Sequence, residues 1–204
     1  MDNTLNYYAT NAKSLSHRYE SANVKNIHEL LLKTFSSDSY LLEIGCGSGR
    51  DASFMYQHGY KVVAIDASKE MVYEAKKLHP ELVNNLYVKT IPHNLDYEDN
   101  SFNGIYSIAT LMHLEKSDIE KTIERIYNYL KPGGRFLFSV STQRDDINDE
   151  DQDIYGRHFT TISQENWISI CESKGFTTLQ VQTSRDGLNR DGIVWLTCIM
   201  EKYE

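Results

Sequence analysis

The 204-residue sequence has few cysteines and no long apolar run, and each absence argues against a class of protein. Its three cysteines, Cys46, Cys171 and Cys198, are an odd number without the spacing of a zinc site, so neither a disulfide framework nor a structural metal is expected. The start of the chain lacks a charged and then apolar signal segment. The longest nearly apolar stretch, residues 192–200, is far shorter than the roughly 20 residues that span a bilayer. We therefore expect a cytoplasmic protein with no metal and no membrane partner.

The sequence also lacks an excess of positive charge. Its formal net charge is −8, and residues 145–153 hold six acidic residues and no basic one, which leaves −2 for the rest. Proteins that bind DNA or RNA need clustered lysine and arginine against the phosphates, so a nucleic-acid partner is not expected. The length and a hydrophobic share of 40% favour one domain with a single core.

Apolar, strand-like segments alternate with amphipathic, helix-like segments along the chain. The pattern predicts strands at residues 40–44, 59–66, 85–89, 102–109, 135–141, 176–182 and 192–200. It predicts helices at residues 49–58, 69–79, 117–130 and 163–174, the second with Ser68 as its N-cap. Such alternation is typical of parallel strands joined by helical crossovers, and the last two adjacent strands suggest an antiparallel edge. The predicted fold class is a doubly wound α/β sandwich.

Residues 41–51, LLEIGCGSGRD, place three glycines at alternate positions directly after an apolar strand. Gly45, Gly47 and Gly49 would let the backbone turn sharply and approach a ligand that a β-carbon would exclude. Asp66 follows 21 residues after Gly45 at the end of the next predicted strand, where an acid can bond both hydroxyls of a ribose. The spacing is G-x-G-x-G and not the G-x-G-x-x-G of dinucleotide sites. These features favour an adenosine-type ligand, with a purely structural turn as the alternative.

Four segments in order resemble the successive signature segments of class I S-adenosylmethionine-dependent methyltransferases. They are LLEIGCGSGRD, VVAIDAS, NSFNGIYSIATLMHL and LKPGGRFLFSV, and the likeness covers residues 38–141. The flanks are similar to small bacterial-type members that methylate small molecules. The resemblance implies a seven-stranded, mostly parallel, Rossmann-like sheet with an antiparallel edge strand, S-adenosyl-L-methionine as cofactor, and methyl transfer as activity. The resemblance also divides the single domain 1–204 into four parts. These are an N-terminal helical lid (1–36), a cofactor-binding core (38–141), an insertion (142–162) and a C-terminal helix and strand pair (163–204).

The resemblance also assigns cofactor-binding residues. Glu43 would orient the turn near the methionine amino group, the backbone of Gly45 to Gly47 would contact the methionine part, and Asp66 would bind the ribose. Ala67 and Met71 would face the adenine. Many members carry an acid for the adenine amino group where this chain has Ile91, so Asn94 or a backbone carbonyl is expected to replace it. The remaining positions assigned to the cofactor site are Cys46, Gly49, Arg50, Leu95 and Ile108.

Methyl transfer is an in-line displacement from a sulfonium, so the protein mainly has to align the acceptor and exclude water. If the acceptor must lose a proton, His113 is the candidate base, and a core or helix-start histidine is the alternative. Tyr8, with Tyr7, would close over the cofactor from the N-terminal segment, or serve only in packing. Arg157 would bind an anionic or carbonyl-bearing acceptor, or pair with the acids of residues 145–153. We predict that Tyr8, His113 and Arg157 face the acceptor.

Three functions remain open from the sequence. The first is methylation of a small-molecule acceptor by a monomer or homodimer. The second is a tRNA wobble-uridine-type methyltransferase, because HRYES near the start and Arg190 with Trp195 faintly resemble those enzymes. The negative net charge of the chain argues against this function, since RNA binding requires positive charge against the phosphates. The third is a non-catalytic S-adenosylmethionine-binding protein, because methyl transfer requires no single obligatory residue.

Overall fold

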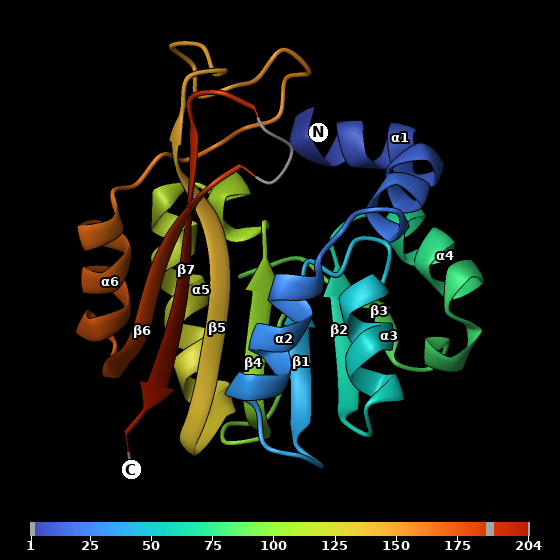
Figure 1. The fold of residues 1–204 in the computed structure, drawn as a ribbon, viewed down its shortest axis with the longest axis vertical. Helices are drawn as coiled ribbons and strands as arrows, with labels where there is room; N and C mark the ends of the chain where they lie inside the picture. The colour runs from blue at the N-terminus through green and yellow to red at the C-terminus, as the bar shows by residue number, and fades with distance from the viewer. Residues whose placement is uncertain (1–2, 187–189, 204) are drawn as a thin grey trace.

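A seven-stranded sheet lies between two layers of helices in the computed structural model, which describes residues 3–186 and 190–203 (Figure 1). The helices are α1 (Asn3–Glu20), α2 (Lys25–Thr34), α3 (Arg50–Gln57), α4 (Lys69–Leu78), α5 (Lys116–Tyr129) and α6 (Gln164–Ser173), with short 3-10 turns η1 (Pro80–Leu82) and η2 (Leu111–His113). The strands are β1 (Tyr40–Ile44), β2 (Lys61–Asp66), β3 (Leu86–Val88), β4 (Phe102–Ile108), β5 (Leu130–Arg144), β6 (Phe176–Arg185) and β7 (Ile193–Lys202).

The strand order is β3-β2-β1-β4-β5-β7-β6. β1 pairs in parallel with both β2 and β4, so Leu42 lies between Val63 and Ile105. β7 runs antiparallel between β5 and the edge strand β6. The predicted doubly wound, mostly parallel sheet with an antiparallel edge is confirmed. Strand order reverses between β1 and β4, and open α/β sheets bind ligands beside the carboxyl ends of the strands at such a point.

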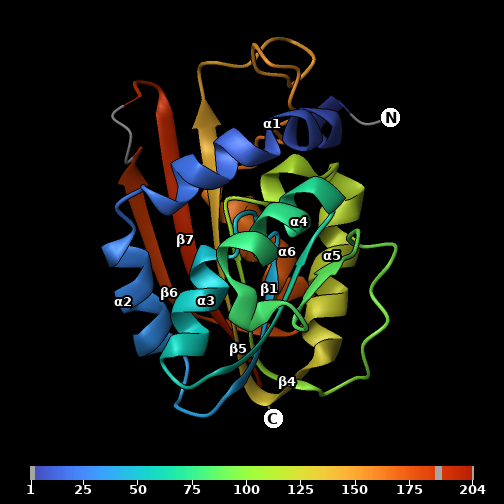
Figure 2. The same ribbon diagram turned by 90° about the vertical axis from the view of Figure 1, so that its right-hand side faces the viewer.

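The sheet is buried on both faces, as expected for parallel strands covered by crossover helices. On one face, Phe136 and Phe138 of β5 pack in one cluster with α5 and α6. On the other face, the core includes Leu31 and residues of α3 and α4. Figure 2 shows these layers edge-on. The predicted cap of α4 is confirmed, because the Ser68 hydroxyl accepts a hydrogen bond from the Met71 N–H.

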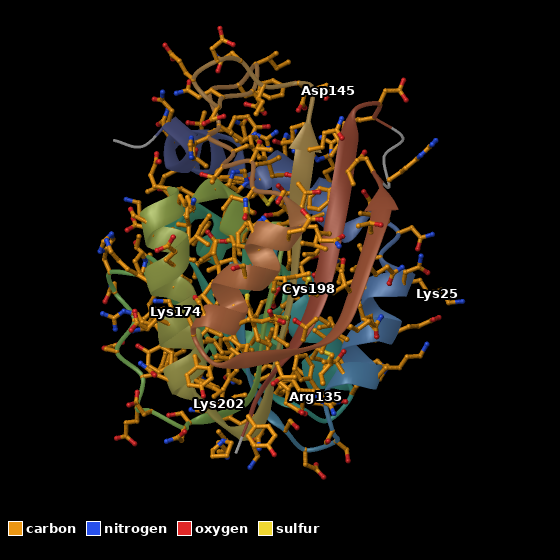
Figure 3. All side chains as sticks on the ribbon, turned by 90° about the vertical axis from the view of Figure 1, so that its left-hand side faces the viewer. Lys25, Arg135, Asp145, Lys174, Cys198 and Lys202 are labelled. Atoms are coloured by element: carbon orange, nitrogen blue, oxygen red, sulfur yellow. The ribbon has the colours of Figure 1, made fainter. Side chains whose placement is uncertain are left out.

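Two segments overhang the carboxyl edge of the sheet. α1 crosses above the strand ends and packs along α4, while α2 lies against the sheet (Figures 1 and 2). The connection between β5 and α6, residues 145–163, rises beside the N-terminal end of α1. Figure 3 shows Asp145 at this edge, whereas Arg135 and Lys202 lie near the opposite end. Within residues 3–186 and 190–203, no helix is long and apolar enough to cross a membrane.

Candidate functional site

A cavity of about 1780 Å³ begins at the carboxyl edge of the sheet beneath α1 and continues along the sheet beside α2 as far as Thr34 and Arg135. It reaches from the glycine turn after β1 and the ends of β2 and β4 to side chains of α1, η2 and residues 153–159. Sites for one small ligand usually measure about 300–1,000 Å³, so the whole cavity is larger than a site for one small ligand. Among the described residues, no group of three or more His, Cys, Asp or Glu side chains could hold a metal ion.

The glycine turn forms one wall of the cavity. Gly45, Gly47 and Gly49 have φ angles of 77°, 54° and 82°, which a residue with a β-carbon adopts only with strain. At Gly45 an added β-carbon would lie 2.1 Å from the hydroxyl oxygen of Thr110, which follows β4. The N–H groups of Gly45 and Cys46 both donate to the Ile65 carbonyl, at 2.8 and 2.9 Å. The turn is therefore locked between β2 and the residues after β4.

Asp66 joins the glycine turn to the start of α4. Its carboxylate accepts hydrogen bonds from the Gly47 and Ser68 N–H groups, each at 2.9 Å. Burial raises the pKa of Asp66, and these backbone N–H groups oppose the rise. Asp66 also lines the cavity, and each carboxylate oxygen has a second lone pair. The Asp66 carboxylate thus stabilises the turn, and it remains available to hydroxyl groups of a ligand.

Glu43 and Arg50 flank the glycine turn, one before it and one after it. The Tyr106 hydroxyl donates to Glu43 at 3.2 Å, and burial beside Asp51 raises the Glu43 pKa well above its usual range. Arg50 donates to both oxygens of Asp51, at 2.8 and 3.0 Å, and to the Tyr19 carbonyl at 2.7 Å. Arg50 therefore connects α1 to α3, although it also borders the cavity.

The expected cofactor residues divide into two groups in the structure. Those that line the cavity are Glu43, Gly45, Cys46, Gly47, Arg50, Asp66, Ala67 and Ile108. Gly49 caps α3, and Met71 packs under α1 with Ala12 and Leu15.

The structure does not bring Asn94 and Leu95 to the cavity wall. The Asn94 N–H donates to the Thr90 carbonyl at 2.7 Å, and this turn leads the chain away from the cavity. Asn94 is exposed, and Leu95 is buried in the sheet core, where its carbonyl accepts from the Tyr129 hydroxyl. Thr90 and Ile91 line the cavity in their place.

Tyr8, His113 and His158 form a hydrogen-bonded chain across the other side of the cavity. A carbonyl can only accept, so the His113 Nδ1–H donates to the His158 carbonyl at 2.7 Å. His113 Nε2 then carries the lone pair and accepts from the Tyr8 hydroxyl at 3.0 Å. Burial, with Arg157 and Arg144 nearby, lowers the pKa of His113 to about 4. His113 is therefore neutral at physiological pH.

Arg157 lies beside this chain and is partnered by an acid. Its Nε and Nη2 donate to one Asp153 oxygen at 2.9 and 2.6 Å. The guanidinium carbon lies 4.9 Å from the centre of the Tyr7 ring and 5.2 Å from that of Phe159. The ion pair that was weighed as the alternative is thus present, and Arg157 lines the cavity as well.

Among the cavity residues that the sequence analysis missed are Tyr19, Thr110 and Arg144. Tyr19 had a readable signal, because Tyr8, Ala12, Leu15 and Tyr19 follow helical spacing and form one buried face with Met71. Thr110 and Arg144 carried no such signal. Arg144 is oriented by Asp146, to which it donates at 2.9 and 2.7 Å.

α1 is fixed over the cavity at both ends. Near its start, the Thr4 hydroxyl accepts from the His158 N–H at 2.8 Å. At its end, Glu20 lies 3.1 Å from His79 Nε2. Burial opposes protonation of His79, but hydrogen bonds and charge from Glu20 and Glu81 outweigh it and raise the pKa of His79.

Comparisons with known proteins agree with this architecture. A family model described as a methyltransferase domain matches residues 15–181. The O-methyltransferase resE of Aspergillus sclerotiorum is 31% identical to this chain, and the match covers 51% of this chain and 40% of the relative. The malonyl-[acyl-carrier protein] O-methyltransferase of Priestia megaterium is also 31% identical, and the match covers 67% of this chain and 47% of that relative. This chain thus spans less than half the length of both relatives.

One solved structure with the same fold is the 1,6-didemethyltoxoflavin-N1-methyltransferase of Burkholderia thailandensis, with bound 1,6-didemethyltoxoflavin and S-adenosylhomocysteine. It has a TM-score of 0.75 and 18% identity, and the match covers 98% of this chain and 88% of that one. At this identity the likeness shows the fold.

Proposed function

The chain belongs to the class I S-adenosylmethionine-dependent methyltransferases, and on that basis we propose that it methylates a small-molecule acceptor bound between α1 and residues 145–163. The observation that carries the proposal is one continuous cavity, bordered by Gly45 and Asp66 at one end and by Tyr8, His113 and Arg157 at the other. A cavity of this kind brings two small ligands together and holds them away from water.

The residues present fit the cofactor. The backbone of the glycine turn and the Asp66 carboxylate both face the cavity, and Ala67 and Ile108 add apolar surface. We assign the turn to the methionine part, Asp66 to the ribose hydroxyls, and Ala67 with Ile108 to the adenine. When bound, S-adenosylmethionine supplies an electrophilic methyl group on a sulfonium sulfur.

The acceptor side supplies positioning and enclosure. Tyr8 and Tyr19, on the buried face of α1, cover the cavity and exclude water. Arg157, held by Asp153, would orient a polar group of the acceptor. The names of the two relatives and of the solved structure all describe methyl transfer, and 1,6-didemethyltoxoflavin is a small molecule, which supports this choice.

The tRNA alternative is not favoured. The segment beside the cavity opening carries the acidic run 145–153, and arginines 144, 157 and 190 each pair with an aspartate. A phosphate backbone would meet little unpaired positive charge there.

The test uses the purified full chain and two measurements. Calorimetry should show binding of S-adenosylhomocysteine and none of NAD. Tritiated methyl from labelled S-adenosylmethionine should enter the low-molecular-weight fraction of a pooled metabolite extract and not a tRNA fraction. Label in tRNA would replace the proposal by the tRNA alternative, and binding without transfer to any fraction would favour the non-catalytic one.

A further inference from the structure

The acceptor side of the cavity holds two arginines whose orientation is fixed by acids. Arg157 binds Asp153 through Nε and Nη2, and Arg144 binds Asp146 through the same two nitrogens. The Arg144 side chain is only 2% exposed. A guanidinium has five N–H bonds, so each ion pair leaves three, and Arg157 directs one of its three to the Tyr8 hydroxyl. Both arginines line the cavity.

The groups around His113 leave it unable to act as a strong base. Tyr8 faces His113 from α1, and Arg144 faces it from β5. The segment 145–163 contributes Arg157, Asp153 and His158. Its Nε2 lone pair already accepts from Tyr8, and its Nδ1–H is held by the His158 carbonyl. With its pKa lowered to about 4, His113 is a weak base towards a phenol, whose pKa is about 10.

The carboxylates nearby are equally engaged. Asp146, Asp153 and Asp186 are the aspartates that line this side of the cavity within the described residues, and each pairs with an arginine. Asp153 also accepts from the N–H groups of Tyr155 and Arg157. An alcohol, phenol or ammonium acceptor on this side would therefore find no unpaired carboxylate among these three aspartates to take its proton. A carboxylic acid needs none, because its pKa of about 4 leaves it ionised at neutral pH.

We propose that the acceptor is a carboxylic acid, held by Arg157 and Arg144, and that the product is its methyl ester. This inference rests on the proposed function of the site. One carboxylate oxygen forms the bond to the methyl carbon as the carbon–sulfur bond breaks, and that bonding pair stays on sulfur. The negative carboxylate and positive sulfonium become a neutral ester and a neutral thioether, and no proton is released.

The arrangement of the side chains suits this reaction. The planar fork of a guanidinium matches a carboxylate, and Arg157 also hydrogen-bonds the Tyr8 hydroxyl, which further fixes its orientation. The aromatic rings of Tyr7 and Phe159 around Arg157 limit access of water. Opposite charges that neutralise each other during the reaction gain from such a site, where water is largely excluded.

The chemical nature of the product tests the inference. The enzyme is incubated with tritiated S-adenosylmethionine and a metabolite extract, and the labelled small molecules are then treated with mild base. A methyl ester releases its label as volatile methanol, whereas methyl ethers and methylamines keep it. Volatile counts are the expected result. A base-stable labelled product would overturn the carboxylate inference and leave the proposed function intact, and absence of any labelled product would contradict both.

Binding provides a second readout that does not depend on turnover. We would measure thermal shifts of the S-adenosylhomocysteine complex with a library of small aliphatic and aromatic carboxylic acids, each paired with its primary amide. We expect some acids to stabilise the wild type while their amides do not, and this difference to disappear in Arg157→Gln. Amides that stabilise the complex as well as their acids do would overturn the inference.

Substitutions of Arg157 test the role of its charge separately from any effect on folding. With the acid identified, Arg157→Gln should raise KM at least tenfold with a smaller change in kcat, and Arg157→Lys should recover part of the loss. Arg125→Gln is the matched control, because Arg125 donates to the Leu95 carbonyl away from the cavity and should keep the wild-type KM. An unchanged KM in Arg157→Gln would contradict the assigned role.

Discussion

The two ends of the cavity are built in different ways. The cofactor end is built around the glycine turn after β1 and the Asp66 carboxylate at the end of β2, and its key contact, Gly47 to Asp66, joins residues 19 positions apart. The acceptor end consists of side chains from distant segments, since Tyr8 and His113 are 105 positions apart and Thr4 and His158 are 154 apart. Local backbone geometry thus determines the first end, and tertiary packing determines the second. We therefore expect substitutions at the second end to alter ligand contacts there without disturbing the sheet.

α1 belongs to both ends, which makes the comparison testable. Its C-terminal residues Tyr19 and Glu20 are held by Arg50 and His79 beside the glycine turn. Its N-terminal residues Thr4 and Tyr8 contact His158 and His113. If the two ends are independent, changes at one end should alter ligand affinity there and leave the other end intact.

The largest effect should follow from Gly45→Ala. The new methyl group would overlap the Thr110 side chain and sit on a backbone with φ of 77°, which together should cost about 2–4 kcal/mol of stability. Displacement of the turn should also lower S-adenosylhomocysteine affinity by about a hundredfold, or roughly 2.7 kcal/mol. Thermal unfolding and calorimetry measure both.

Gly59→Ala is the matched control for that change. Gly59 has a φ of 89°, but an added β-carbon there meets nothing within 4 Å. It should cost only the backbone strain, about 1 kcal/mol, and leave cofactor affinity unchanged. Equal losses in both variants would mean that the contact between Gly45 and Thr110 contributes nothing.

Asp66→Asn should have the next largest effect. The amide loses the negative charge that favours ribose hydroxyls, and charge-assisted hydrogen bonds contribute about 1.5–3 kcal/mol each. We expect S-adenosylhomocysteine affinity to fall ten- to a hundredfold, with a lower melting temperature because Gly47 and Ser68 both donate to this carboxylate. Asp38→Asn, at an exposed residue before β1, changes the charge equally and should change neither quantity. Wild-type affinity in Asp66→Asn would limit Asp66 to its structural role.

The sequence was informative where structure is local. The strand and helix alternation, the glycine turn, the Ser68 cap and the position of Asp66 at the end of β2 all follow from residues close in the chain. Asn94 and Leu95, which the resemblance assigned to the cofactor, lie away from the cavity wall because the turn from Thr90 to Asn94 directs Leu95 into the core. No residue type in that stretch signals this direction.

Only part of the acceptor end could be predicted from the sequence. Tyr8, His113 and Arg157 were predicted individually to face the acceptor, and all three line the cavity. No sequence pattern indicated that Tyr8 donates to His113 or that His158 fixes the His113 tautomer. These contacts depend on how α1 and residues 145–163 pack over the sheet. Arg144 reaches the same site from the end of β5, at the close of a long strand that gave no hint of a ligand contact.

Tyr8→Phe tests the acceptor end alone. It removes the hydrogen bond to His113 Nε2, which is worth about 0.5–1.5 kcal/mol, so turnover should fall about three- to tenfold. S-adenosylhomocysteine affinity should stay within about twofold of wild type, because the aromatic ring that covers the cavity is retained. Tyr73→Phe, which removes a hydroxyl from an exposed ring on α4, controls for the substitution. A loss of cofactor affinity that matches the loss of turnover would show that the two ends are coupled through α1.

The smallest effect concerns the C-terminal end of α1, where His79 pairs with Glu20. The pKa of His79 is raised in the folded state, so the pair stabilises the protein fully below the unfolded value of about 6.5, and this stability is lost as pH rises through the folded value. A partly exposed pair of this kind contributes about 0.5–1 kcal/mol. The wild type should therefore exceed His79→Gln in stability at pH 6, and the difference should shrink towards zero by about pH 9. Because Glu20 lies beside the glycine turn and far from Tyr8 along α1, His79→Gln should weaken S-adenosylhomocysteine binding slightly and leave acceptor KM unchanged. A stability difference that grows with pH, or a rise in acceptor KM without weaker cofactor binding, would assign the end of α1 to the acceptor side instead.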